Sequence, residues 1–469
     1  MKGREKQDTK HALLMSFLKL MHYCVSAAGF AIVWWFFYSQ HTLENYHPNT
    51  DYLIFTVYCV LLFFLFKTYH VYNIGYARVT DNLFGQVLSN IISAGIVYFI
   101  ACILSGQFLH PLELLALCLA QFVWDAVWSK GVKTLYRKIY KTLATVVVYR
   151  DEEDLQRVEE IRRLTRRLDF RKYIKNPDDN FRELEKELDG FDAVVVIGVN
   201  ASLRNGILKY SIQNGVRCFV APHVGDIIMQ GALHISSFRV PIFSVRRAFK
   251  NPFYLIAKRL FDILVSFCAI TLLSPVYLIT ALIIKLYDHG PVFYKQVRLT
   301  KDGKTFKVLK FRSMRVDAEK DGVARLAAEN DDRITPVGKF IRSCRLDELP
   351  QFFNILGGSM SIVGPRPERP EIAAQYLEEM PAFSLRLQVK AGLTGFAQVY
   401  GKYNTTPYDK LQMDLMYVNK MSVSEDLRLM FATLRALFKS ESTEGIDKDA
   451  TTAMKVKANN DVQLNEAES

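Results

Sequence analysis

Four long apolar runs in the first third of the chain restrict what it can fold into. They cover about residues 12–38, 52–66, 83–104 and 112–128. About 20 apolar residues are enough to cross the hydrocarbon core of a bilayer as a helix, and the second run is short for that. The first run is too long for the core of a signal peptide. Because the runs show little polar face, we expect a four-helix transmembrane bundle over residues 1–143 rather than a soluble bundle.

The basic residues orient this bundle. The loops at 40–51 and 105–111 contain no Lys or Arg, whereas the N-terminal segment, the 67–82 loop and residues 130–141 contain several. By the positive-inside rule, both ends of the bundle lie on the cytoplasmic side. Lys19 lies near the start of the first run, where its ammonium group can extend to the headgroups.

Composition and charge exclude several classes of protein. Half of the chain is hydrophobic and 13% is aromatic, which is high for a soluble enzyme. The formal net charge of +12 suits anionic lipid or anionic substrates. No nucleic-acid-binding motif accompanies that charge, so nucleic acid is not expected as a partner. The seven cysteines form no CxxC pair, which indicates neither a zinc site nor a disulfide framework.

Residues 144–250 change to an alternating β/α pattern. Apolar β-branched runs cover 145–149, 193–197 and 217–221, and charged helical stretches cover about 152–168 and 202–213. Such runs are typical of buried parallel strands, so we expect an α/β domain of Rossmann-like type. The phosphate-binding GxGxxG turn is missing, although Gly198-Val199-Asn200 stands where it would begin. A structural or regulatory role is therefore favoured over nucleotide binding.

The apolar stretch 260–287 is long enough to span a bilayer, but two features oppose a simple fifth crossing. Ser274-Pro275, near its middle, breaks the backbone hydrogen-bond ladder and would bend the helix, and Ser274 can supply a partner for a freed carbonyl. Basic residues flank the stretch on both sides: Arg246, Arg247, Lys258 and Arg259 before it, and Lys285, Lys295 and Arg298 after it. A re-entrant membrane helix that returns to the cytoplasmic face satisfies both observations.

Residues 292–314 predict a β-hairpin. Alternating residues flank a turn at Asp302-Gly303, which is a typical hairpin signal. Lys310 and Arg312 alternate with Phe311, so both cations lie on one face of the second strand. They could bind a substrate phosphate, and the alternative is a solvated basic strand.

Adjacent carboxylates, Asp347 and Glu348, lie among arginines within residues 342–370. Such a pair suits a site that handles phosphate and a divalent cation, in which one carboxylate is a nucleophile and the other holds Mg²⁺. The nearby cations and the stiff turn are candidate phosphate contacts. They are Arg342 and Arg345, on a helix that begins at Thr335-Pro336, and Arg366, within the turn of Gly364, Pro365 and Pro367.

The same pair has a simpler interpretation. Asp347 is a good helix N-cap, with Glu348 in the first turn and Pro350 near the helix start. A helix from residue 349 onward would then bury an apolar face. That face would consist of Leu349, Phe352, Phe353 and Leu356.

Six motifs in residues 258–445 resemble the bacterial sugar transferase family, the monotopic phosphoglycosyl transferases. The motifs are KRLFD at 258–262, Ser274-Pro275, KFRSM at 310–314, LDELPQ at 346–351, VGPRPE at 363–368 and GLTGFAQV at 392–399. The chain departs from the family pattern at Ser359, where relatives often carry an acidic residue. The resemblance implies an α+β catalytic domain at 251–445 that contains the re-entrant helix at about 260–287. The tail at 446–469 is polar, so we expect it to be disordered.

The resemblance also implies an activity. Members of the family transfer a sugar-1-phosphate, here expected to be a hexose phosphate, from a UDP-sugar to undecaprenyl phosphate and release UMP. Asp347 would be the nucleophile and Glu348 the Mg²⁺ ligand, while Lys310, Arg345 and Arg366 stabilise the transferred phosphoryl group. Arg312 and Arg342 are further candidates for substrate binding.

The biological setting follows from the same resemblance. We expect a multi-pass protein of the bacterial inner (cytoplasmic) membrane, with its catalytic domain on the cytoplasmic face and in contact with membrane lipid. It would initiate exopolysaccharide, capsule or O-antigen assembly. A membrane-bound glycosyltransferase that releases UDP and a non-catalytic scaffold or regulator are the alternatives. The sequence leaves open the sugar, the glycan, the role of the Rossmann-like domain and whether the chain forms a homodimer.

Overall fold

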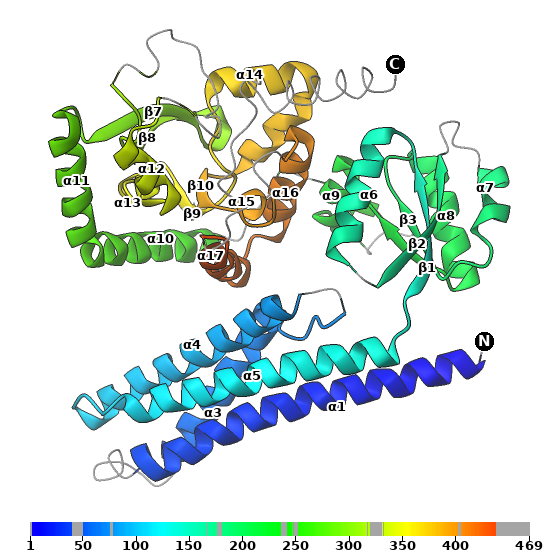
Figure 1. Ribbon diagram of the computed structural model, residues 1–469, viewed down its shortest axis with the longest axis horizontal. Coiled ribbons are helices and arrows are strands. Elements are labelled where there is room, and N and C mark those ends of the chain that lie inside the picture. Colours follow the sequence, from blue (N-terminus) through cyan, green and yellow to red (C-terminus); the bar gives the residue numbers. More distant parts are fainter. Residues whose placement is uncertain are drawn as a thin grey trace. The chain divides into compact units, whose positions relative to one another are not determined.

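The chain forms two compact units, Met1–Ala221 and Pro222–Ser469 (Figure 1). The computed structural model describes residues 2–39, 50–75, 78–165, 167–175, 181–235, 242–245, 247, 252–316, 318, 331, 333–401 and 405–437. The predicted disordered tail at 446–469 and the basic residue Arg246 lie outside the described residues.

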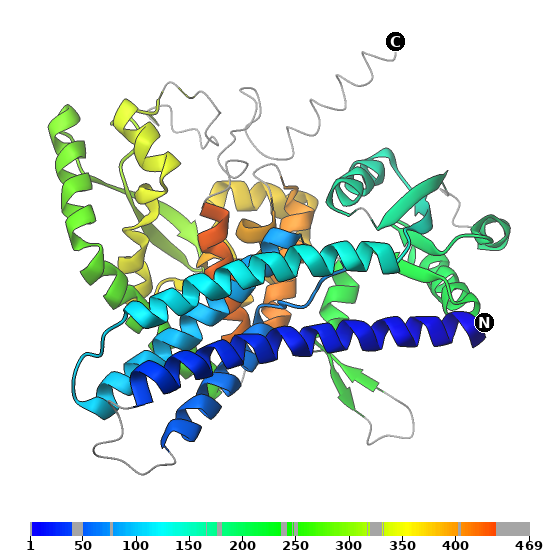
Figure 2. The ribbon, with the colours of Figure 1, turned by 60° about the horizontal axis from the view of Figure 1, so that its bottom comes forward.

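The first unit begins with the predicted bundle. Its helices are α1 (Lys2–Val33), which continues into the π-helical turn η1 (Trp34–Tyr38), α3 (Thr50–Thr68), α4 (Val79–Ser105) and α5 (Leu112–Ile139). All four are long and apolar enough to cross a membrane, which confirms the four predicted spans. The short second run lengthens to the 19 residues of α3. Figures 1 and 2 both show α1 and α5 running side by side, and α5 also packs along α4.

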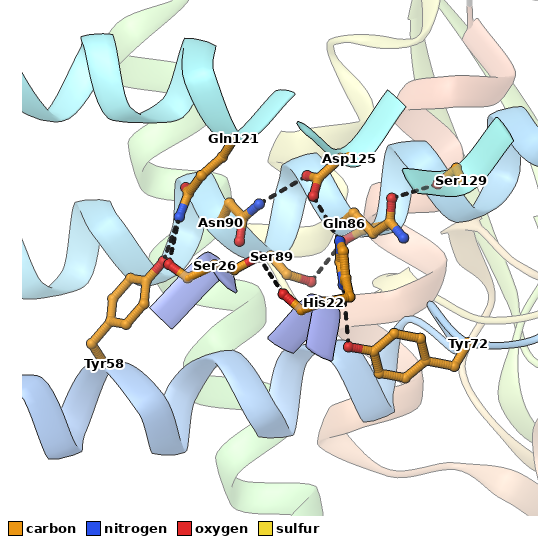
Figure 3. Close-up of polar contacts among 11 residues, drawn as sticks. His22, Ser26, Tyr58, Tyr72, Gln86, Ser89, Asn90, Gln121, Asp125 and Ser129 are labelled. Carbon is orange, nitrogen blue, oxygen red and sulfur yellow. Dashed lines mark hydrogen bonds and ion pairs between the residues drawn. The ribbon is translucent and has the colours of Figure 1, made fainter. Parts of the chain in front are cut away.

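A polar network lies inside this bundle (Figure 3). The His22 and Asp125 side chains are fully buried, and His22 Nε2 lies 2.9 Å from Asp125 Oδ1. Asn90 donates to the other Asp125 oxygen at 2.9 Å. Hydrogen bonds of this kind join helices in lipid, where no water offers an alternative partner. These residues lie inside apolar runs, and no motif in the sequence marks them.

The rest of the first unit is a parallel four-stranded sheet in the order β2-β1-β3-β4. Its elements are β1 (Leu143–Tyr149), α6 (Glu152–Leu164), β2 (Leu168–Lys175), α7 (Phe181–Leu188), β3 (Ala193–Val196), α8 (Ala201–Asn214) and β4 (Arg217–Val220). Val146 and Val194 face α7 and α8, whereas Val147 and Val195 face α6, so helices cover both faces of the sheet. The predicted parallel α/β pattern is confirmed, and its Rossmann-like character stays a prediction.

The edge strand β2 and the turn at Gly198 bear on what the sequence predicted for this domain. The strand β2 was missed because it is an edge strand with mostly exposed or half-buried residues, including Arg171 and Lys172. Gly198, after β3, has a left-handed φ of 73°, and a Cβ there would collide with the Asp154 carboxylate. Asp154 accepts hydrogen bonds from the backbone N–H groups of Arg150 and Asp151. A carboxylate at this turn is unfavourable for a phosphate, in agreement with the missing fingerprint.

The second unit begins at Pro222, so α9 (Val224–Gln230) packs within it against α16 (Pro407–Lys420). A two-stranded antiparallel ribbon follows, formed by β5 (Leu233–Ile235) and β6 (Ile242–Ser244). From the sequence we expected these residues to belong to the preceding α/β domain at 144–250.

A bent pair of apolar helices comes next, α10 (Pro252–Leu272) and α11 (Ser274–Asp288). The two meet at an angle of 61° across Leu273, at the predicted position, and Figure 1 shows them as two arms at the edge of the unit. Ser274 donates its hydroxyl to the carbonyl of Thr271 at 2.8 Å, as expected for a partner at the break. Helix α10 begins eight residues before the predicted start. A broken span and a re-entrant loop both fit this shape.

The predicted hairpin is confirmed. Strands β7 (Phe293–Leu299) and β8 (Thr305–Phe311) pair antiparallel, with Phe293 opposite Phe311. The 3-10 turn η3 (Lys301–Gly303) joins them, and both Asp302 and Gly303 have left-handed φ values, as hairpin turns of this kind require.

The remaining elements pack behind the hairpin. They are α12 (Pro336–Ser343), η4 (Leu346–Glu348), α13 (Gln351–Leu356), β9 (Ser361–Val363), α14 (Pro370–Glu379), η5 (Pro381–Gln388), β10 (Gly392–Thr394), α15 (Phe396–Tyr400), α16 and α17 (Val423–Leu437). Val308 of β8, Ile355 of α13, Ile362 of β9 and Tyr417 of α16 belong to one buried cluster. This cluster holds the segments before and after the acidic pair in fixed positions.

Candidate active site

The acidic pair lies in the single 3-10 turn η4, between α12 and α13. Arg345 precedes the turn with a left-handed φ of 54°, which is unusual for a residue with a side chain and reverses the chain after α12. The N-cap positions of η4 and α13 are occupied by Arg345 and Pro350, without side-chain caps. The interpretation of Asp347 as a helix N-cap is therefore wrong.

The prediction of a buried apolar face for that helix is also wrong in part. Helix α13 begins at Gln351, two residues later than expected, and its buried residues are Gln351 and Ile355. Phe353 is 43% exposed. The prolyl residue at 350 and the 3-10 turn before it rotate the helix relative to the expected start.

Glu348 joins two cations that are distant in sequence. Its Oε1 lies 3.3 Å from Lys310 Nζ, on β8, and 3.0 Å from Arg366 Nη2, in the proline-rich turn. Burial alone would raise the pKa of Glu348, but the charges of Arg366, Lys310 and Arg345 hold it well below its usual range. These charges therefore keep Glu348 in its ionised, carboxylate form.

Asp347 has the opposite character. Burial and the negative charge of Glu348 raise the pKa of Asp347 to about 6, although Lys310, Arg342 and Arg366 oppose the rise. Among the described residues, no cation lies within ion-pair distance of its carboxylate. Two neighbouring carboxylates with separated pKa values typically have separate tasks in catalysis. The partnered Glu348 suits an electrostatic task, and the unpartnered Asp347 suits a nucleophile.

Glycines hold the proline-rich turn in place. Gly364 N donates to Thr394 O at 2.8 Å, and Gly392 N donates to Pro365 O at 2.9 Å. A Cβ on Gly392 would collide with the backbone of Gly364, so this approach of two chains requires glycine. The motifs VGPRPE and GLTGFAQV thus form one structure, which fixes the backbone that carries Arg366.

Buried charges support the same turn. Arg386 donates to the Arg366 carbonyl at 2.9 Å and lies 2.7 Å from Asp414, and both side chains of this pair are almost fully buried. Arg298 donates to the Pro367 carbonyl at 3.0 Å. Arg386 and Asp414 were missed because nothing in the sequence connects α16 with η5. From the sequence, Arg298 was expected only as one of the basic residues that flank the apolar stretch 260–287.

The KRLFD motif attaches the bent helices to the site. Lys258 lies 2.9 Å from Asp426. Arg259 donates to the last carbonyls of α13, those of Ile355 and Leu356. Asp262 accepts a hydrogen bond from the N–H of Ile362 at 3.0 Å. The two cations that were expected to flank a membrane helix are therefore bonded within the unit.

The second helix of the bent pair is attached too. The Tyr277 hydroxyl, on α11, donates to the carbonyl of Leu349 at 2.6 Å, directly after the acidic pair. Both helices are thus bonded to the stretch that follows Glu348, α11 at Leu349 and α10 at Ile355 and Leu356. Ser274 and Pro275 form the bend between these attachment points, which agrees with their expected structural role.

Not every expected residue converges on Glu348. Arg312 is buried and forms an ion pair with Asp288, at the end of α11, so it does not share the partner of Lys310. Arg342 and Arg345 act on the acidic pair through their charge: Arg342 lowers the pKa of Asp347 and Arg345 that of Glu348. Arg312 therefore connects the hairpin with the bent helices, and its expected role in binding substrate stays a prediction.

The acidic pair fits one kind of metal site. Among the described residues, no group of three His, Cys, Asp or Glu side chains could hold a metal ion. Mg²⁺ is often held through one or two carboxylates and the phosphates of a substrate. Both ion pairs of Glu348 are made by Oε1, and its Oε2 forms no hydrogen bond or ion pair with any residue that the structure describes. Glu348 is therefore suited to share Mg²⁺ with a diphosphate rather than to hold it with protein ligands alone.

Comparison with known proteins agrees with this geometry. Residues 253–440 match the model of the family described as bacterial sugar transferase. An exopolysaccharide production protein, PSS, of Rhizobium leguminosarum bv. phaseoli is 41% identical over 189 residues, which are 38% of this chain and 94% of that protein. The chain belongs to the bacterial sugar transferase family. The expected resemblance is thus confirmed, and the family's matched region contains the acidic pair, the hairpin and the bent helices.

Two larger members of the family are similar over the same fraction of the chain. A UDP-glucose:undecaprenyl-phosphate glucose-1-phosphate transferase of Klebsiella pneumoniae is 43% identical over 200 residues, 42% of this chain and 43% of that protein. A UDP-N-acetylgalactosamine-undecaprenyl-phosphate N-acetylgalactosaminephosphotransferase of Aeromonas hydrophila is 42% identical over 190 residues, 40% of this chain and 45% of that protein. The chain matches less than half the length of both. Because the two names differ in the sugar, the similarity does not select a donor.

Proposed function

We propose that this protein transfers a sugar-1-phosphate from a UDP-sugar to undecaprenyl phosphate, with release of UMP, and so initiates the assembly of an exopolysaccharide, capsule or O-antigen. The observation that carries the proposal is the asymmetry of the acidic pair. Glu348 is ionised and joined to Lys310 and Arg366, whereas Asp347 has no ion-pair partner among the described residues and its pKa is raised to about 6 by burial and by Glu348. In a bacterial sugar transferase, the two carboxylates can divide the tasks of nucleophile and electrostatic stabilisation.

In the first step, a carboxylate oxygen of Asp347 attacks the phosphorus that carries the sugar. The bond from this phosphorus to the bridging oxygen breaks, and UMP leaves with that oxygen. Lys310 and Arg366 lie beside the pair and would neutralise charge on the phosphoryl oxygens as it develops. Covalent catalysis suits substrates of different solubility, because UMP can leave before the lipid is engaged.

In the second step, an oxygen of undecaprenyl phosphate attacks the acyl phosphate on Asp347. The bond between the carboxylate and phosphorus breaks, which regenerates Asp347 and yields a lipid-linked diphosphosugar. When bound, Mg²⁺ would be held by Glu348 and would reduce the negative charge of the donor's diphosphate.

The bent pair α10–α11 has the shape that this reaction needs. We propose that it enters the membrane from the cytoplasmic face and returns to it, as a re-entrant helix, in the bacterial inner membrane. Its exposed apolar side chains, such as Leu264, Phe267 and Leu278, would contact lipid. Because α11 is bonded to Leu349, directly after the acidic pair, and α10 to Ile355 at the end of α13, Asp347 and Glu348 would then lie at the level of lipid phosphates.

The products separate this function from its rivals. UMP release from a UDP-sugar in the presence of undecaprenyl phosphate supports the proposal, and UDP release supports a glycosyltransferase that moves the sugar alone. Asp347→Asn should abolish UMP release. Glu371→Gln, which neutralises an exposed carboxylate on α14, is the matched control and should retain it. Robust UMP release by Asp347→Asn in membranes free of other transferases would overturn the assignment, and no nucleotide release from any donor would favour a scaffold.

A further inference from the structure

A cavity with a cationic end opens on the transmembrane bundle, outside the unit that holds the acidic pair. It has a volume of about 670 Å³ and lies between α1 and the end of α3 with the loop after it. Lys19, Lys67 and His70 are among its lining residues, together with aromatic side chains that include Phe63 and Phe66. Both helices are drawn in blue in Figure 2.

The cavity continues as an apolar groove along α3. A second cavity, of about 340 Å³, shares Tyr23 and Phe63 with the first and extends to Phe55. From Lys67 to Phe55 the helix rises by about 18 Å, at about 1.5 Å per residue. The two cavities together therefore form a groove along α3, with Lys67 toward one end and mostly apolar side chains toward Phe55.

The two lysines lie at the depth of lipid headgroups. Apolar residues follow Lys19 along α1 as far as Tyr38, a rise of about 30 Å, which is the thickness of the hydrocarbon core. Lys67 closes the apolar run of α3, and α3 runs antiparallel to α1. Within the part of the chain that the structure describes, neither ammonium group forms an ion pair. Two unneutralised cations at this level favour an anionic headgroup.

The walls of the groove are held from within the bundle. The Tyr23 hydroxyl donates to the Cys59 carbonyl at 2.7 Å and joins α1 to α3. Tyr72, which lines the cationic cavity, has its hydroxyl 3.3 Å from Nδ1 of the buried His22 (Figure 3). His22 is in turn bonded to Asp125 of α5. The groove is therefore preformed, which lowers the entropic cost of binding.

We propose that this groove binds a single-chain lipid with a phosphate monoester head, the chemical class of a polyprenyl phosphate. Two lysines match the two negative charges of a monoester better than the single charge of a phospholipid diester. A path between two helices also suits one chain better than two. The choice of a polyprenyl chain rests on the proposed function, in which such a lipid is the acceptor. The groove would then be a second site for the acceptor class, separate from the acidic pair.

Photoaffinity labelling of the full-length protein in phosphatidylcholine nanodiscs tests the proposal. The probe is a polyprenyl phosphate with a diazirine in its first isoprene unit, and labelled peptides are mapped by mass spectrometry. We expect labels on the α1 and α3 peptides that contain Tyr23 and Phe63. Undecaprenyl phosphate should compete for them, whereas undecaprenol, phosphatidylglycerol and inorganic phosphate should not.

A pair of double variants supplies the control. Lys19→Ala with Lys67→Ala should reduce groove labelling at least fivefold. Lys130→Ala with Lys138→Ala removes the same charge from exposed positions of α5 and should leave labelling unchanged. Equal labelling of the two double variants would overturn the proposal, as would competition by phosphatidylglycerol or by inorganic phosphate. Asp347→Asn should retain groove labelling, so this result is independent of whether UMP release is observed.

Discussion

The raised pKa of Asp347 predicts the pH dependence of the first chemical step. The pKa is raised to about 6 by burial and by the charge of Glu348, so the carboxylate is protonated below pH 6 and ionised above it. About nine-tenths of the molecules carry the nucleophilic carboxylate at pH 7 and about one-tenth at pH 5. The rate of UMP release in a single turnover without acceptor should therefore fall about tenfold between these pH values.

A substitution in helix α12 should shift the pH dependence of UMP release. Arg342 lowers the pKa of Asp347, so Arg342→Gln should raise it and shift the acidic limb upward by about half a pH unit. Lys339→Gln removes the same charge from an exposed position of the same helix and should leave the limb in place. Rapid-quench measurement of UMP between pH 4.5 and 8, values chosen to bracket the pKa of about 6, provides the data. A limb near pH 4, or equal profiles for the two variants, would refute the reasoning.

Three further predictions concern the support of the site. Asp414→Ala removes the nearer ion-pair partner of the buried Arg386, whose other partner, Glu368, lies 3.7 Å away, and should lower the free energy of unfolding by about 3 kcal/mol, measured by denaturant unfolding in detergent. Gly392→Ala forces a Cβ into the backbone of Gly364 and should reduce UMP release at least tenfold. A Cβ at Gly225 would lie in open space, so Gly225→Ala should leave UMP release unchanged. Equal activities of the two variants would contradict the packing argument. Removal of Mg²⁺ by EDTA should stop UMP release without lowering the melting temperature, and activity that persists after chelation would exclude the role given to Glu348.

Local signals in the sequence predicted much of the fold. The apolar runs predicted four spans, the Asp302-Gly303 turn predicted the hairpin, and Ser274-Pro275 predicted the bend, because each depends on a few adjacent residues. The strand β2 gave no such signal, since its position at the edge of the sheet removes the need for an apolar run. The start of α13 was misplaced because a 3-10 turn and a helical first turn share the same favourable residues.

The sequence predicted the chemical groups of the candidate site but not the ion pairs that join them across the fold. Asp347 and Glu348 are adjacent in sequence, so their pairing needed no knowledge of the fold. The residue pattern and the resemblance to the family both made Lys310 and Arg366 candidates, and only the fold joins both to one oxygen of Glu348. Two other ion pairs join residues of different elements that are far apart in sequence, so no local pattern predicts them. They are Arg386 with Asp414 and Arg312 with Asp288.

The most direct test of the account is the mass of the peptide that contains Asp347. The protein is mixed with a UDP-sugar in the absence of undecaprenyl phosphate, quenched in acid, digested and analysed by mass spectrometry. The account predicts that this peptide gains the mass of one sugar phosphate on Asp347, and that addition of undecaprenyl phosphate before the quench removes it. UMP release without any such adduct, or an adduct on another residue, would contradict the account.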